Sequence, residues 1–219
     1  MQFIHKPIHI PEITADIKHG IRHYNCNGNE YPSITSVLGY GPKEFLIEWR
    51  ERLGEEAADV ETKRCADRGT AVHAMCENYL NNTEIGEYSP FDIKLFKKLK
   101  YVLRNINNIA IQEVGLYSDA LKVAGRVDCI AEYKGVLSII DFKTSNNVKT
   151  DEMCNDYFLQ ETFYSLALLE GTGIDVEQIV TIIAVERQMN PQVFIKNRNN
   201  YISELNKRIE KFYLEFKGE

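Results

Sequence analysis

The chain has 219 residues, a length typical of one domain with elaborations. Hydrophobic residues make up 44% and charged residues 26%, so the composition argues against disorder, collagen-like repeats and small disulfide scaffolds. The 26 lysines and arginines stand against 32 aspartates and glutamates, and a net charge of −6 argues against a protein that coats nucleic acid through bulk positive charge. An enzyme with a local basic groove around acidic metal ligands remains compatible with this charge.

The sequence has the features of a cytosolic protein. Its apolar runs are far shorter than the roughly 20 residues of a membrane helix, so we expect no membrane span. Residues 1–20 resemble neither a signal peptide nor a transit peptide. The five cysteines are scattered without a C-x-x-C pair, which favours reduced thiols.

The N-terminal half predicts an arm followed by helices. Residues 1–30 are polar and irregular and predict an extended arm with a strand or two; their histidines fit no metal spacing. Residues 31–38 have the proline and hydroxyl groups of a helix start. Residues 43–68 predict a charged helical segment, residues 69–80 a second helix and Ser89-Pro90 the start of a third. The helical spacing in the charged segment comes from Phe45, Trp49, Leu53 and Ala57.

After Asn108 the hydrophobic period changes from helical to two. The pattern predicts three strands, a helix, a strand, a turn with a short strand, and a closing amphipathic helix. These elements are 109–118, 122–133, 136–142, 150–170, 178–186, a turn at Asn190-Pro191, and a helix that carries Ile202, Leu205, Ile209, Phe212 and Phe216. The order indicates an α/β domain around a mixed sheet. We expect a single domain, 1–219, made of the arm (1–30), a helical wall (31–107), a catalytic core (108–190) and a C-terminal strand and helix (191–219).

Two carboxylates face each other in the predicted hairpin. With Lys134-Gly135 as the turn, the cross-strand pairing places Asp128 opposite Asp141, about 5 Å apart on one face. Lys143 points to the same face because strand side chains alternate. Like charges this close favour a divalent cation, and Mg²⁺ or Mn²⁺ prefers such oxygen ligands. In the alternative interpretation, Asp128 is a turn residue and Asp141 forms a salt bridge with Lys143.

Four ordered motifs resemble the P-D-(D/E)-x-K nuclease superfamily in its RecB-type branch. They are G-x-x-D at 125–128, D-x-K at 141–143, Q-x-x-x-Y at 160–164 and an upstream helix with a histidine at 68–73. Residues 31–49, with YPSITSVL and an F-x-x-x-W helix, are further similar to the mitochondrial genome maintenance exonucleases and related phage exonucleases. The resemblance extends from about residue 31 to 170.

The resemblance implies a restriction-endonuclease-like core, an αβββαβ mixed sheet flanked by helices, with an N-terminal helical elaboration. It implies that His73, Asp128, Asp141 and the Phe142 carbonyl hold Mg²⁺ or Mn²⁺. Lys143 would orient the attacking water or neutralise charge on the phosphate. Glu113, on the strand before the hairpin, would join the metal shell or hold a water. For His73 and Glu113 an alternative stays open. His73 could be an ordinary half-buried histidine, and Glu113 could be a surface glutamate.

Further residues are candidates for DNA contact. Gln160 and Tyr164 share a helix face that looks toward the cleft, unless Tyr164 belongs to the core. Ser33 and Thr35 lie where a helix start could bind phosphate, unless they only cap it. Weaker candidates for contact with the DNA backbone are Arg68, Thr144 and Ser145.

We therefore expect a metal-dependent deoxyribonuclease, an exonuclease on single-stranded DNA ends in replication, repair or recombination. It would act as a cytoplasmic monomer of a bacterium or phage-infected cell, with a possible replication or recombination partner and without a membrane. No cysteine lies beyond Cys154, so we expect no iron–sulfur cluster. The alternatives are a structure-specific or restriction-type endonuclease and a non-catalytic DNA-binding module of the same fold.

Overall fold

A five-stranded mixed sheet lies at the centre of the computed structural model, which describes residues 2–42 and 44–216 without the side chain of Phe45. The strands are β4 (Ile106–Ser118), β5 (Val123–Tyr133), β6 (Val136–Ser145), β7 (Gln178–Val185) and β8 (Gln192–Asn197), in that spatial order. Neighbouring strands are antiparallel except β6 and β7, which are parallel. The predicted mixed sheet is confirmed, and β4 and β6 are each three residues longer than predicted.

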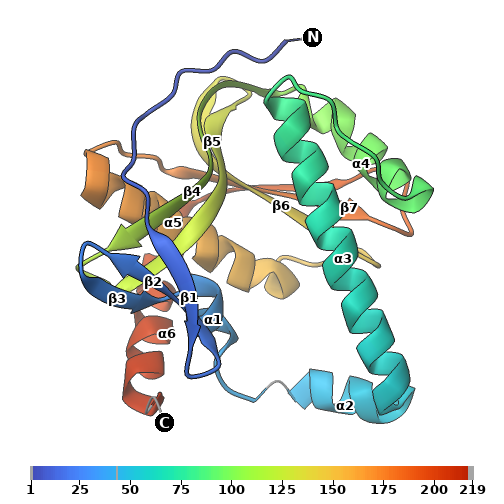
Figure 1. Ribbon diagram of the computed structural model, residues 1–219, viewed down its shortest axis with the longest axis horizontal. Coiled ribbons are helices and arrows are strands. Elements are labelled where there is room, and N and C mark those ends of the chain that lie inside the picture. Colours follow the sequence, from blue (N-terminus) through green and yellow to red (C-terminus); the bar gives the residue numbers. More distant parts are fainter. Residues whose placement is uncertain (1, 43, 217–219) are drawn as a thin grey trace.

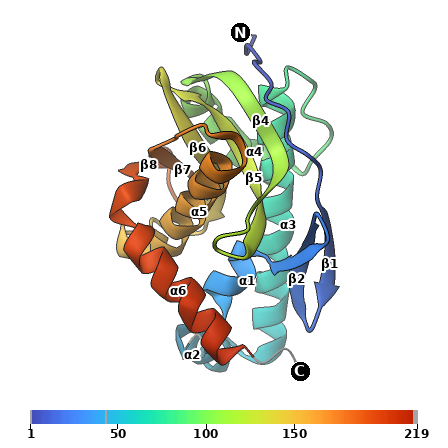
Figure 2. The same cartoon turned by 90° about the vertical axis from the view of Figure 1, so that its left-hand side faces the viewer.

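Helices cover both faces of this sheet (Figures 1 and 2). On one face pack α1 (Ile34–Gly39), α5 (Asn155–Thr172) and α6 (Ile202–Glu215). On the other face pack α3 (Glu55–Leu80) and α4 (Pro90–Leu103). Since parallel strands need a crossover connection, α5 provides the link between β6 and β7. Two hydrophobic cores result, one on each side of the sheet.

The hairpin turn that sets the register of β5 and β6 is as predicted. Lys134 and Gly135 both have positive φ, 52° and 81°, which is the backbone conformation of a tight two-residue hairpin turn. Pairing begins at Tyr133 with Val136 and continues to Cys129 with Ile140. The register therefore follows from the two turn residues alone.

The N-terminal arm forms a small sheet of its own. Three antiparallel strands, β1 (Thr14–Lys18), β2 (Ile21–Cys26) and β3 (Asn29–Pro32), replace the strand or two that the sequence predicts. A parallel bridge from Ser33 to Ala124 joins the end of this sheet to β5. The N-terminal sheet thus lies beside the start of β5 (Figure 1).

The helix boundary predicted near Gly69 is wrong. α3 is one helix of 26 residues, and the break lies earlier, at Gly54, whose φ of 86° is left-handed. A single interior glycine costs only about 1 kcal/mol, too little to end a helix that packs on the sheet. The charged segment predicted over residues 43–68 is divided between α2 (Glu44–Leu53) and α3. Of the residues that gave its helical spacing, Leu53 and Ala57 are exposed, whereas the neighbouring Ala58 is buried.

The two other helix starts differ in how well they were predicted. Ser89 caps α4, with its Oγ accepting from the N–H of Asp92, and Pro90 is the first helical residue, as expected. α5 begins at Asn155, after a 3₁₀ turn at Glu152–Cys154, and so later than predicted. Among the described residues, no helix has the length and apolar character required to cross a membrane.

Candidate active site

A cavity of about 390 Å³ lies where α3 passes over β4, β5 and β6. Most of the residues predicted for the site line this cavity. They are Ser33, Thr35, His73, Glu113, Asp128, Lys143, Gln160 and Tyr164. Apart from Ser33, which precedes α1, these side chains come from six different elements, so the tertiary structure gathers residues that are up to 131 positions apart, from Ser33 to Tyr164.

Three side chains in this cavity can share one cation. His73 on α3, Glu113 on β4 and Asp128 on β5 each offer a ligand atom, and these atoms lie within 4.8 Å of one another. The Nδ1 of His73 is 3.3 Å from the Oδ2 of Asp128. All three residues are half-buried, which leaves them accessible from the cavity.

Glu113 reaches this group through an unusual backbone conformation. It lies opposite Asp128, because its neighbours pair as Gln112 with Cys129 and Val114 with Val127. Its φ of 52° is left-handed, a conformation that costs a residue with a side chain about 1–2 kcal/mol. Such backbone is maintained where the surrounding structure enforces it, often at functional sites.

The electrostatic environment of Glu113 is strongly perturbed. Burial, and next the negative charge of Asp128, raise the pKa of Glu113 to about 7. The Nε of Arg126 lies 2.9 Å from the Oε2 of Glu113 and opposes this shift only in part. The carboxyl group of Glu113 therefore resists ionisation beside the carboxylate of Asp128. A bound cation would favour the ionised form of Glu113.

Strands β5 and β6 part at the site. The paired positions end at Cys129 with Ile140, one step before the predicted opposition of Asp128 and Asp141. Beyond that point the Oδ2 of Asp128 accepts a hydrogen bond from the backbone N–H of Phe142 at 2.9 Å. The carboxylate of Asp128, and not the backbone of β5, therefore accepts the hydrogen bond from Phe142.

Asp141 forms the ion pair of the alternative interpretation, and its role as a metal ligand stays a prediction. Its side chain is 1% exposed and forms an ion pair with Lys143, and it is not part of the three-residue group around His73. The pKa of Asp141 is raised to about 6, mainly by burial; Lys143 opposes this rise and Asp128 adds to it. Burial lowers the pKa of Lys143, but Asp141 and Asp128 outweigh this, and its pKa lies above the usual value.

The residues present fit a divalent cation. The buried Oδ1 of Asp141 has no hydrogen-bond partner among the described residues, which is costly for a carboxylate. Beside Asp141, the carboxylates of Glu113 and Asp128 and the imidazole of His73 have ligand atoms within 4.8 Å of one another. Oxygen donors suit Mg²⁺ and Mn²⁺, and one imidazole is better tolerated by Mn²⁺. Whether the Phe142 carbonyl contributes stays a prediction.

Gln160 and Tyr164 occupy one wall of the cavity. They lie one turn apart on α5, and the amide Nε2 of Gln160 is 3.0 Å from the hydroxyl of Tyr164. Both are buried and both line the cavity, so Tyr164 belongs to the core and to the cleft at once. A Cβ at Gly125 would lie 2.9 Å from Tyr164 and 3.0 Å from Ile34, which explains a glycine at the first position of the G-x-x-D motif.

Ser33 and Thr35 lie at the start of α1. Ser33 is the N-cap, and its Oγ accepts from the backbone N–H of Ser36 at 3.1 Å and lies 3.0 Å from the Oγ1 of Thr35. Capping is therefore the structural role of Ser33. Thr35 is exposed and also lines the cavity.

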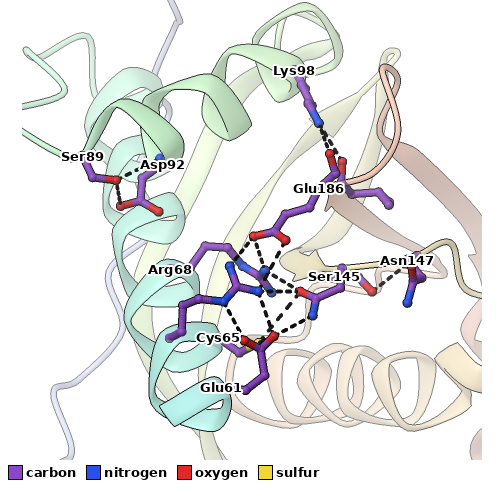
Figure 3. A network of polar contacts seen from close by, with 12 residues as sticks. Glu61, Cys65, Arg68, Ser89, Asp92, Lys98, Ser145, Asn147 and Glu186 are labelled. Atoms are coloured by element: carbon purple, nitrogen blue, oxygen red, sulfur yellow. Dashed lines mark hydrogen bonds and ion pairs between the residues drawn. The ribbon is translucent and has the colours of Figure 1, made fainter. Parts of the chain in front are cut away.

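Arg68, Thr144 and Ser145 do not line this cavity. The guanidinium of Arg68 is buried and donates to Asn146 and Glu186, both at 2.6 Å (Figure 3). Ser145 donates to the Asn147 carbonyl in the same region. The network joins α3 to the segments that follow β6 and β7, and so fixes the helix that carries His73.

Four charged residues of the site were not predicted from the sequence. Glu77 lies one helical turn after His73, so helical spacing from the histidine could have found it, and Arg126 stands inside the G-x-x-D motif. Glu161 is fully buried on α5, and burial followed by Asp141 raises its pKa well above the usual value. Arg22, on β2, has no sequence signal.

A mixed sheet flanked by helices, with a histidine, carboxylates and a lysine where two strands part, is the architecture of restriction-endonuclease-like nucleases. The family model described as PD-(D/E)XK nuclease superfamily matches residues 93–212. The chain belongs to the PD-(D/E)XK nuclease superfamily, and the resemblance in the motifs is confirmed.

Curated relatives include the mitochondrial genome maintenance exonuclease 1 of three vertebrates. The Mus musculus protein is 33% identical over 132 residues, which cover 55% of this chain and 39% of that protein. The Homo sapiens protein is 30% identical over 148 residues, covering 62% and 40%, and the Xenopus tropicalis protein is 30% identical over 138 residues, covering 58% and 40%. The match thus spans about 40% of the length of these relatives.

Proposed function

We propose that this protein is a metal-dependent deoxyribonuclease that removes nucleotides from the ends of single-stranded DNA in replication, repair or recombination. One observation carries the proposal. The ligand group of His73, Glu113 and Asp128 shares a cavity with Lys143, which is ion-paired to Asp141. Membership of the nuclease superfamily supports phosphodiester hydrolysis, and relatives named as exonucleases support action at ends.

Each residue has a role that follows from its position. His73, Glu113 and Asp128 would hold the cation, with Asp141 adjoining them. A bound divalent cation polarises the phosphate and lowers the pKa of a water ligand. Lys143 lines the cavity and keeps its proton, because its pKa is raised, so it serves as a positive charge and not as a base. A fixed cation in a half-buried site stabilises negative charge that develops on the phosphate.

The preference for a free end is supported by the helices before the core. The C-terminal half of α3 runs over the sheet, while α2 and the first turns of α3 extend beyond the sheet (Figure 1). The apolar side chains Leu46, Ile47 and Val60 in this region are exposed. We suggest that these helices form one side of an arch through which only a free strand end passes.

The test compares linear and circular single-stranded DNA of equal length with Mg²⁺ or Mn²⁺. Wild type is compared with Asp128→Asn and Lys143→Ala, and with Lys63→Ala as a control on the exposed face of α3. The proposal expects digestion of the linear strand only, lost in the two site variants and kept in the control. Fast cutting of the circle would favour the endonuclease, and binding without any cutting would favour the DNA-binding module.

A further inference from the structure

A second hollow of about 690 Å³ adjoins the candidate active site. Its walls come from β1, β2, β4, β5 and the segment before β1, so it lies between the N-terminal sheet and the central sheet. Four residues line both hollows, Arg22, Tyr24, Glu113 and Arg126. The two hollows therefore meet at these residues, directly beside the ligand group that contains Glu113.

Arg22 is the unsatisfied cation at this junction. It is exposed on β2, and its guanidinium forms no hydrogen bond or ion pair with the residues that the structure describes. Its backbone carbonyl accepts the N–H of Ser33 at 2.8 Å. Arg126, the other arginine of the junction, is already paired with Glu113. The positive charge of Arg22 is thus available to a ligand.

The charges around the junction limit what that ligand can be. Glu12 and Asp16 line the second hollow but not the active-site cavity, so an anion is disfavoured inside the second hollow. At the junction, a guanidinium presents a planar fork of donors that matches the oxygens of a phosphate. The second hollow also has apolar walls, from Ile13 and Ile17 among others, against which a nucleoside can pack.

We propose that Arg22 binds a backbone phosphate of the DNA strand at the junction of the two hollows, so that the N-terminal sheet forms part of the substrate-binding surface. The strand would pass from the active-site cavity to Arg22, and only the nucleoside beside the bound phosphate would enter the second hollow. This inference rests on the proposed function. It concerns a part of the chain outside the matched family region, which begins at residue 93.

The experiment compares Arg22→Ala and Arg22→Lys with a matched control, Arg104→Ala. Arg104 is also exposed, its side chain has no partner among the described residues, and it lines neither hollow. Steady-state cleavage of a linear single-stranded oligonucleotide is measured with Mn²⁺. Binding of the same oligonucleotide is measured by fluorescence anisotropy in an Asp128→Asn background, at several salt concentrations.

We expect Arg22→Ala to raise KM and Kd about tenfold, because one charge-assisted hydrogen-bonding contact is lost. The kcat should stay within about twofold of the wild-type value. The slope of log Kd against log salt should fall by roughly 0.7, the value for one phosphate of a single strand. Arg22→Lys should recover part of the affinity. Thermal unfolding should not change, because the side chain has no structural partner among the described residues.

The outcomes separate this inference from the proposed function. If wild type cuts DNA and Arg22→Ala behaves like Arg104→Ala in KM, Kd and salt slope, the inference is overturned and the nuclease proposal stands. If wild type binds without cutting and Arg22→Ala weakens binding, the inference stands and the proposed activity is wrong. If wild type neither cuts nor binds single-stranded DNA, both are overturned.

Discussion

The Oδ2 of Asp128 lies 3.3 Å from the Nδ1 of His73 and accepts the backbone N–H of Phe142 at 2.9 Å. One carboxylate oxygen therefore connects α3, β5 and β6. Phe142 stands between Asp141 and Lys143, so this hydrogen bond also sets where the ion pair lies relative to the ligand group. The geometry of the candidate site depends on this contact more than on the strand pairing, which ends before it.

Removing His73 should weaken cation binding without unfolding the protein. The loss of a residue that supports a metal ligand reduces metal affinity about tenfold to hundredfold. We expect His73→Ala, which removes a ligand itself, to reduce Mn²⁺ affinity by at least this factor. Wild type should bind Mn²⁺ more tightly than Mg²⁺, because Mn²⁺ accepts an imidazole ligand more readily. Isothermal titration calorimetry measures both. His9→Ala, an exposed histidine of the N-terminal segment, is the control, and an equal loss in that variant would contradict the assignment.

Lys143 should be needed for catalysis for a reason that is separable from folding. Lys143→Met leaves the buried Asp141 without its partner, which costs about 3–5 kcal/mol of stability when a buried pair is broken. The double variant Asp141→Asn, Lys143→Met removes both charges and should recover much of that stability. Cleavage should fall about 100- to 1,000-fold in both. Chemical denaturation and single-turnover cleavage give the two readouts; recovery of cleavage with stability in the double variant would refute a catalytic role.

The stability of the metal-free protein should fall as the pH rises toward neutrality. The pKa of Glu113 is raised from 4.5 to about 7, so the folded state binds the proton more tightly than the unfolded state. The stabilisation is complete below about pH 4.5 and is lost as the pH passes about 7. Wild type should lose about 2–3 kcal/mol more than Glu113→Gln between about pH 5 and pH 8.

Urea denaturation in the presence of a chelator measures this difference. Saturating Mn²⁺ should reduce it, because a bound cation favours the ionised carboxylate. Parallel pH profiles for wild type and Glu113→Gln without metal would show that the Glu113 carboxyl is not perturbed as described.

The glycine of the G-x-x-D motif should be intolerant of a methyl group. In Gly125→Ala the new Cβ would approach Tyr164 to 2.9 Å and Ile34 to 3.0 Å, and relieving this overlap should cost about 1–3 kcal/mol. Gly171→Ala is the matched control, since a Cβ there meets nothing within 4 Å and the residue lies inside α5. The control should be stabilised by up to about 1 kcal/mol. Thermal unfolding distinguishes them, and equal melting temperatures would rule out the close packing.

The sequence was most informative where local rules decide the structure. The turn at Lys134-Gly135 fixed the register of β5 and β6 as far as Cys129 and Ile140, because each pairing follows from the one before. Ser89 and Pro90 marked the start of α4 through capping chemistry alone. The ordered motifs indicated the superfamily, and the family match confirmed it.

Tertiary structure decided the features that depend on distant contacts. Gly69 remains inside α3 because the helix packs on the sheet. Its neighbour Arg68 is buried and forms an ion pair with Glu186, which is distant in the sequence. Glu113 joins His73 and Asp128 through a left-handed backbone that no strand pattern predicts. Arg22 reaches the site only because the N-terminal sheet lies beside β5.

By itself, the sequence determined the order of the elements from α4 onward, the hairpin and most of the chemical groups of the site, since these follow from hydrophobic period, turn residues and motifs. It did not determine which carboxylates lie beside His73. Asp141 forms an ion pair with Lys143, and Glu113 lies beside Asp128. This arrangement depends on burial and on charges that separate strands bring together. Such long-range electrostatics exist only in the folded chain.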